Sequence, residues 1–401
     1  MKPLYNCAAF KALLRENIKI NLLLLDIDSF SNVNDSYGIE YGDLVFKKAE
    51  VILRNFGFEL IDIYKLESDE FALVSKKILD TDTFIEMANE IRSFFNESEI
   101  ELDEEYKLKI SFSMGIASGK GLSVLNQARL AIKDLRQYTR GTYKIYDMES
   151  TYVKAIQENI YWVNKIQECI ADDRIIAFYQ PIINNKTKKI EKYESLARID
   201  DDDNFVSPYH FMDAAKSTKL LSFITKSMIK QACKTFRGTE YEFSINITNN
   251  DLQLGYLEEY LVRNAKLYNI NPNRIVLELL EDISSLDIGT ILKQIDSLRD
   301  KGFKFAIDDF GSESSNFSRL LEFQPHYLKI DGAFIKNILT DKKSQVITSG
   351  IVSIAHAMGI KVIAEYIHSQ EVQDKIEELN IDYSQGYIHG KPSRKIKEET
   401  K

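Results

Sequence analysis

The chain has 401 residues, more than one hydrophobic core usually serves, so we expect two domains that each bury a sizeable core. It is 44% hydrophobic and 28% charged, which is typical of a soluble globular protein. Its formal net charge of -9 argues against binding a nucleic-acid polymer, because phosphate-backbone binding relies on clustered Lys and Arg. A small anionic ligand held by metal stays compatible with that charge.

The cysteines and the apolar runs indicate the cellular compartment of the protein. Cys7, Cys169 and Cys233 are scattered, with no CxxC pair, which suits a reducing cytosol and predicts thiols in the core. The longest apolar runs, "NLLLLDID" and "IVSIAHAMGIKVIAEYI", are too short or too interrupted to span a bilayer, and the N-terminus has no signal pattern. We therefore expect a cytoplasmic protein with no membrane segment.

Residues 1–147 have the pattern of an α/β domain. The segments "INLLLLDID", "FALVS" and "LKISFSMGIAS" look like strands, whereas "YGDLVFKKAEVILRNFG" and "TFIEMANEIRSFFN" carry apolar residues at helical spacing. In residues 148–172 apolar residues then repeat every three or four positions. This spacing predicts an amphipathic connecting helix between two domains.

Residues 173–401 alternate between strand and helix patterns more tightly. The strand candidates are "IIAFYQPII", "KIEKYESLARI", "YEFSINIT", "RIVLELLE", "KFAIDDF", "YLKID", "KVIAEYI" and "YSQGYI". Helical patterns such as "GTILKQIDSLRDKG" lie between most of them. Roughly eight strands over about 225 residues match a (β/α)8 TIM-barrel-like fold in size and order.

Polar residues recur at or near the ends of these predicted strands. A single acid there would be equally well explained as the start of a loop, but seven strands share the feature. The residues are Glu194, Asn246, Glu278, Asp308 with Asp309, Lys329 with Asp331, Glu365, and Gln385. In such barrels the carboxyl ends of the strands carry the chemistry, so we expect these side chains to converge.

Converging carboxylates repel one another unless cations are bound. Hard cations prefer oxygen ligands, which points to Mg²⁺ or Mn²⁺, and the five histidines show no zinc-ligand spacing. The reaction class that this composition serves best is hydrolysis of a phosphodiester by two metal ions, which clamp the phosphodiester and activate water.

These motifs resemble the EAL phosphodiesterases, which hydrolyse cyclic di-GMP to linear pGpG. The signature triplet appears as Glu194-Ser195-Leu196, with Ser in place of the central Ala. The supporting motifs are "QPI" at Gln180, "NIT" at Asn246, "ELLE" at 278–281, "DDFG" at Asp308, "KID" at Lys329, "AE" at Glu365 and "QGY" at Gln385. The resemblance covers residues 173–393 and implies an EAL domain that forms homodimers.

The resemblance also implies the role of each matching residue. It makes metal ligands, or their immediate neighbours, of Glu194, Asn246, Glu278, Asp308, Asp309 and Glu365. Asp331 would ligate metal or act as the base, Lys329 would orient the attacking water, and Glu281 would steady the loop after the sixth strand. The expected contacts to substrate are Gln180, Leu196, Arg198 and Gln385.

Residues 1–147 resemble a GGDEF diguanylate cyclase domain through "LLLLDIDSFSNVNDSYGIEYGD", "ISFSMGIAS" and "ARLAIKDLRQYTRG". The resemblance implies a GTP site made of Asp26, Asn34, Asp43, Asp69, Glu70, Arg136 and Arg140. The signature itself reads "ESDEF", so Glu67 and Ser68 replace the glycines that let backbone approach the nucleotide phosphates. We therefore expect a silent cyclase domain that binds GTP as a regulator.

The leading hypothesis is a metal-dependent cyclic di-GMP phosphodiesterase with an inactive GGDEF domain. The alternative is a receptor that binds cyclic di-GMP and signals through partners. Glu313 stands where the family pattern has glycine, and a second altered motif, "AEYIH", places Tyr366 and His368 near the rim. The departures at Glu313 and Tyr366 favour the receptor, whereas the complete ligand set favours the enzyme. A third possibility, a bifunctional enzyme with a working cyclase, is opposed by Glu67 and Ser68.

Overall fold

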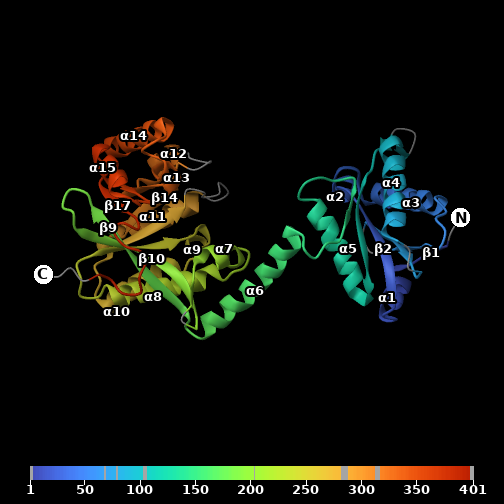
Figure 1. The fold of residues 1–401 in the computed structure, drawn as a ribbon, viewed down its shortest axis with the longest axis horizontal. Helices are drawn as coiled ribbons and strands as arrows, with labels where there is room; N and C mark the ends of the chain where they lie inside the picture. The colour runs from blue at the N-terminus through green and yellow to red at the C-terminus, as the bar shows by residue number, and fades with distance from the viewer. Residues whose placement is uncertain are drawn as a thin grey trace. The chain divides into compact units, whose positions relative to one another are not determined.

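The computed structural model describes residues 3–66, 69–77, 80–102, 106–202, 204–280, 288–311 and 317–397 (Figure 1). The chain divides into two compact units, Met1–Glu158 and Asn159–Lys401. Helix α6 (Thr151–Ala171) contains the division and carries the chain from the first unit into the second. Within the described ranges, no helix is long and apolar enough to cross a membrane.

The first unit is built on a six-stranded sheet. Its order is β1 (Leu4–Tyr5), β3 (Asp62–Lys65), β4 (Glu70–Ser75), β2 (Lys19–Ile27), β7 (Phe112–Lys120) and β8 (Tyr143–Ile145). A short hairpin of β5 (Ile100–Glu101) and β6 (Lys107–Leu108) lies apart from this sheet. The helices are α1 (Cys7–Arg15), α2 (Phe30–Tyr37), α3 (Ile39–Asn55), α4 (Thr81–Glu97) and α5 (Gly121–Leu135).

Strand β2 divides the core of the first unit into two layers, because its side chains alternate between the faces of the sheet. Leu22 and Leu24 pack with residues of α1 and α5 on one face. Leu23 and Leu25 pack with residues of α3 and α4 on the other face. The run of leucines in "NLLLLDID" therefore forms a strand of an α/β domain, as predicted, and this strand lies inside the sheet with helices on both faces.

The second unit is a closed barrel. Around the ring, in the described part of the chain, run β9 (Ile175–Asn184), β10 (Ile190–Asp201), β12 (Glu242–Ile247), β13 (Ile275–Leu280), β14 (Lys304–Phe310), β15 (Tyr327–Ile330), β16 (Lys361–Ala364) and β17 (Tyr383–Gln385). Pairing of β9 with both β10 and β17 closes the ring, and β11 (Asn204–Val206) flanks β10 outside it. The TIM-barrel-like prediction is confirmed.

Two features of the ring differ from a regular (β/α)8 barrel. Strand β9 runs antiparallel to both of its neighbours, whereas the other ring strands are parallel to one another. Strand β10 continues beyond the ring as a ribbon with β9 and β11, so Glu194 lies in its middle and not near its end as expected.

Helices surround the ring and bury the outward-facing side chains of its strands (Figure 1). They are α7 (Pro208–Lys216), α8 (Leu221–Thr235), α9 (Asn249–Gln253), α10 (Leu257–Tyr268), α11 (Ile288–Asp300), α12 (Phe317–Phe323), α13 (Gly332–Lys336), α14 (Lys342–Ala357) and α15 (Gln370–Glu378), with a 3₁₀ turn at Pro272–Arg274. Of the cysteines expected in the core, Cys169 and Cys233 are buried, whereas Cys7, in the first turn of α1, is half-buried.

Candidate functional site

The polar residues of the barrel converge because inward-facing positions recur every second residue along a strand. An apolar layer fills the barrel interior, and it consists of Ile182, Val276, Ala306, Tyr327, Ile363 and Tyr383. Two positions farther along their strands, at the carboxyl ends, come Glu278, Asp308, Lys329, Glu365 and Gln385. The same alternation that fills the barrel therefore collects the predicted residues in one layer above it.

Lys329 is at the centre of this layer. Its side chain is 1% exposed, and its Nζ lies 2.9 Å from Asp308 Oδ1, 2.9 Å from Glu365 Oε1, 3.1 Å from Glu278 Oε2 and 3.5 Å from Glu194 Oε2. Burial alone would lower the pKa of Lys329, but these carboxylates raise its pKa well above the ordinary value. One ammonium therefore faces four carboxylates.

The carboxylates differ in how well they are stabilised. Burial raises the pKa of Glu365 to about 8, and burial also raises the pKa values of Glu278 and Asp308, with Lys329 opposing the shift in each case. Burial acts the same way on Glu194, but Lys329, Gln385 and Asn246 donate to it and hold its pKa below the ordinary value. Without a cation, negative charge in this layer is only partly compensated.

Two amides position Glu194. Asn246 Nδ2 donates to its Oε1 at 3.1 Å, and Gln385 Nε2 donates to its Oε2 at 2.6 Å. Gln385 Nε2 also lies 3.2 Å from Gln180 Oε1, whose residue faces Glu194 across the β9–β10 pair. Gln385 Oε1 is buried and has no hydrogen-bond partner in the described ranges, so an electron pair is available in the site.

The acids form two groups that fit divalent cations. Oxygens of Glu194, Glu278 and Asp308 lie within 4.8 Å of one another, as do oxygens of Asp308, Asp309 and Glu365. Asp308 belongs to both groups. A set made only of oxygen donors suits Mg²⁺ or Mn²⁺, and the unpartnered Gln385 Oε1 beside Glu194 adds one more oxygen of the same kind.

Asp309 joins the second group through an unusual backbone. Its φ is 54°, a left-handed conformation that Asp adopts more readily than most residues, and its amide donates to Asp308 Oδ1 at 3.0 Å. Burial, Asp308 and Asp331 raise the pKa of Asp309 to about 6. The adjacent carboxylates of "DDFG" are thus both turned toward the same site.

The other predicted residues lie around this layer in different ways. Asp331 caps helix α13 by accepting from the Ala333 amide at 2.8 Å, and it is absent from the two acid groups found in the described ranges. Arg198 donates to Ala197 O at 2.7 Å and stacks over Phe178. Glu281, Glu313, Glu67 and Ser68 lie outside the described residues.

A cavity of about 440 Å³ opens beside the carboxylates. Of the predicted residues, Gln180, Glu194, Leu196, Glu365 and Gln385 line it. Sequence reasoning noted Tyr366 and His368 near the rim, and both line the cavity, but it missed Gly332 and Tyr387. The "QGY" motif contains Tyr387, which would have been the signal for that residue.

The predicted acids of the first unit are paired with arginines. Asp26 and Glu70 face each other across β2 and β4. Arg136 bonds to Asp26 through both terminal nitrogens, at 2.6 and 3.1 Å, and Arg129, which sequence reasoning missed, forms a two-pronged ion pair with Glu70. Burial raises the pKa of Asp26 to about 6 despite Arg136.

Other residues of the predicted GTP site lie in α2, in α3 and in the segment that follows α5. Asn34 is in α2 and Asp43 is exposed in α3, whereas Arg140 donates to Ser29 Oγ at 2.9 Å. Arg136 also bonds to Asp28, a residue that sequence reasoning missed and that accepts from Ser111 and Ser113. The metal-binding acids expected here thus already hold internal cationic partners.

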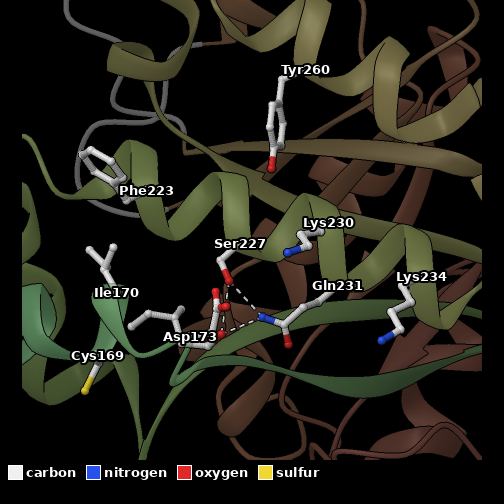
Figure 2. Close-up of a pocket in the computed structure, with 10 residues that line it drawn as sticks. Cys169, Ile170, Asp173, Phe223, Ser227, Lys230, Gln231, Lys234 and Tyr260 are labelled. Atoms are coloured by element: carbon white, nitrogen blue, oxygen red, sulfur yellow. Dashed lines mark hydrogen bonds between the residues drawn. The ribbon is translucent and has the colours of Figure 1, made fainter. Parts of the chain in front are cut away.

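A second hollow, of about 390 Å³, lies on the outside of the barrel and serves the fold (Figure 2). Gln231 accepts from the Ala177 amide at 3.0 Å and donates to Ile175 O at 2.6 Å, and Ser227 donates to the same carbonyl. These groups belong to the edge of β9 that β17 is too short to cover. The central polar side chains of this hollow, Ser227 and Gln231, therefore satisfy backbone groups at the uncovered edge of β9.

Comparisons with known proteins agree with this geometry. A family model described as "EAL domain" matches residues 163–392, and one described as "Diguanylate cyclase, GGDEF domain" matches residues 7–141. The chain belongs to the EAL domain family. It carries its EAL domain in tandem with a GGDEF domain, as the motifs predicted.

Two similar proteins match along most of this chain. Cyclic di-GMP phosphodiesterase PdeB of Shewanella oneidensis is 28% identical over 386 residues, which cover 92% of this chain and 44% of that protein. Signaling protein YkoW of Bacillus subtilis is 28% identical over 391 residues, which cover 92% of this chain and 47% of that protein. This chain thus spans about half the length of the curated relatives it matches.

This chain is also similar to a solved structure. The Bacillus subtilis YkuI protein, which has an EAL domain and was solved with cyclic di-GMP and calcium, is 26% identical with a TM-score of 0.53. The match covers 59% of this chain and 58% of that one.

Proposed function

We propose that the chain is a metal-dependent phosphodiesterase that hydrolyses cyclic di-GMP to linear pGpG. The observation that carries the proposal is the pair of overlapping acid groups that share Asp308 around the buried Lys329. When all five carboxyl groups are ionised, they exceed the single ammonium by four negative charges, which two divalent cations would balance. The names of the relatives and the ligands of YkuI support the same substrate and the need for metal.

The residues divide the work by position. Glu194, Glu278 and Asp308 would hold one cation, and Asp308, Asp309 and Glu365 the other, with Asn246 and Gln385 fixing Glu194. Bound cations would polarise the phosphate and lower the pKa of water. Lys329 would orient that water, because its ammonium points at the carboxylates of both groups.

Substrate contacts are proposed from the cavity walls. Gln180 and Leu196 line the cavity, and Arg198, on the same strand beyond Leu196, would meet a phosphate at the rim. Asp331 lies close enough to raise the pKa of Asp309, so it would act as a ligand or base only after leaving its helix cap.

The GGDEF domain is proposed to be catalytically silent and to bind GTP as a regulator. Support comes from the arginines that already neutralise Asp26 and Glu70 and from the altered signature. Homodimer formation through the EAL domain and a cytoplasmic location stay predictions from sequence.

The test is incubation of the purified chain with cyclic di-GMP and Mg²⁺ or Mn²⁺, followed by nucleotide chromatography. We expect pGpG, no product in chelator, and at least a hundredfold loss in Glu194→Gln. Ser195→Ala is the matched control, because this neighbour faces away from the site. Binding of cyclic di-GMP without turnover would instead support the receptor function, which the substitution at Tyr366 favours.

A further inference from the structure

Tyr366, the residue after Glu365, has a backbone that its side chain does not favour. Its φ is 59°, in the left-handed region where bulky side chains are rare and glycine is preferred. Residues persist in such conformations when the surrounding structure holds them, and they are concentrated at functional sites.

The surroundings of Tyr366 include a space made for it. A Cβ atom added to Gly332 would lie 2.9 Å from the Tyr366 Cβ, a distance that real Cβ atoms essentially never show. Any other residue at position 332 would therefore push the tyrosine away. Gly332, at the start of α13, therefore leaves room for the Tyr366 side chain at the left-handed turn after β16.

Core packing does not account for this arrangement. The Tyr366 side chain is 53% exposed and lines the cavity that Glu194 and Glu365 also line. The nearest ring in the described residues is His368, with centroids 5.5 Å apart, so the phenol is free to take a further flat partner. An exposed aromatic face beside a carboxylate layer suits a ligand with both a phosphate and a planar base.

We propose that Tyr366 is a stacking platform for a guanine of cyclic di-GMP and determines substrate affinity. This inference rests on the proposed function. The sequence marked Tyr366 only as a departure from the family pattern, and the inference assigns it a contact with substrate. Aromatic rings bind nucleobases through stacking, whose loss costs roughly a factor of ten or more in affinity. The competing possibility is that Tyr366 obstructs the cavity.

The two possibilities give opposite results in one series of variants. Tyr366→Gly removes both the ring and the backbone strain, Tyr366→Leu keeps the strain without a flat ring, and Tyr366→Phe keeps the ring. The control is Leu60→Gly, because Leu60 has the same φ of 59° and is 52% exposed but lies in the first unit. KM, kcat and the melting temperature are measured for each with cyclic di-GMP and Mn²⁺.

We expect KM to rise roughly tenfold or more in Tyr366→Gly and Tyr366→Leu, with kcat nearly unchanged, and to stay near the wild-type value in Tyr366→Phe. The melting temperature of Tyr366→Gly should equal or exceed that of the wild type, which rules out misfolding as the cause. Leu60→Gly should leave KM unchanged. An unchanged or lower KM in Tyr366→Gly overturns the platform, whereas a wild-type chain that neither binds nor hydrolyses cyclic di-GMP overturns the proposed function itself.

Discussion

Replacing Lys329 with Met tests whether one ammonium holds the acid layer together. The ammonium lies within 3.5 Å of four carboxylates, and its side chain is 1% exposed. Removing one partner of a buried ion pair costs about 3–5 kcal/mol, because the charge left behind has no compensation. For a domain of this size that corresponds to a loss of roughly 6–20 °C in Tm.

The assay uses the single tryptophan of the chain. Trp162 packs near Phe211 in the second unit, with ring centroids 6.3 Å apart, so its fluorescence reports unfolding of the barrel. Melting is followed in chelator and in excess Mg²⁺. We expect the full loss in chelator and partial recovery with Mg²⁺, because cations bind the same carboxylates, while turnover stays low in both.

Lys192→Met is the matched control. Lys192 is also buried, and its Nζ bonds to Glu242 and lies 2.8 Å from the Tyr327 hydroxyl at the other end of the barrel. Glu242 keeps Lys304 at 2.5 Å when Lys192 is lost, so the control should lose less stability. Lys329→Met with wild-type stability in chelator, or an equal loss in both variants, would refute the reasoning.

Three further outcomes follow from single contacts. In chelator, barrel stability should fall as pH rises from 4.5 to about 8: burial raises the pKa of Glu365 from 4.5 to about 8, so the unfolded state gives up its proton first and is favoured. Trp162 fluorescence measures the stability, and a constant stability across that pH range would contradict the raised pKa of Glu365. Arg129→Ala should destabilise the first unit by about 1 kcal/mol by leaving Glu70 without its ion pair, and neither it nor the wild type should convert GTP to cyclic di-GMP on chromatography. Ser195→Ala should raise the free energy of unfolding by about 1 kcal/mol in urea titrations, because the buried Ser195 hydroxyl has no partner in the described ranges; a loss of stability would reveal one.

The strand pattern predicted the barrel but missed the direction of β9. Alternating apolar residues mark a strand and its faces, yet they read the same in either direction. The signal was the connection: only residues 185–189 separate β9 from β10. A parallel crossover needs about a dozen residues or more, whereas a hairpin needs only a few. Applied to "NKTKK", this rule gives the antiparallel pair.

The convergence of the acids was predictable, but their partners were not. Strand-end positions collect on one face of any barrel, which brought Glu278, Asp308 and Glu365 together as expected. Lys329 and Asp331 are two positions apart in "KID", and an ion pair between them was one interpretation of the sequence. Strand β15 ends at Ile330, however, so Asp331 turns away to cap α13 while Lys329 stays in the barrel.

The two ends of the barrel differ in how well their buried charges are compensated. At the amino ends of the strands, Glu242 is matched by Lys192 and Lys304, so charge is compensated by the protein itself. At the carboxyl ends the same inward alternation places Lys329 among four acids. The same fold therefore accommodates a compensated charge at one end of the barrel and an excess of acids at the other. Packing alone does not require that excess. An uncompensated buried charge is costly, and the cations proposed for this site would offset that cost.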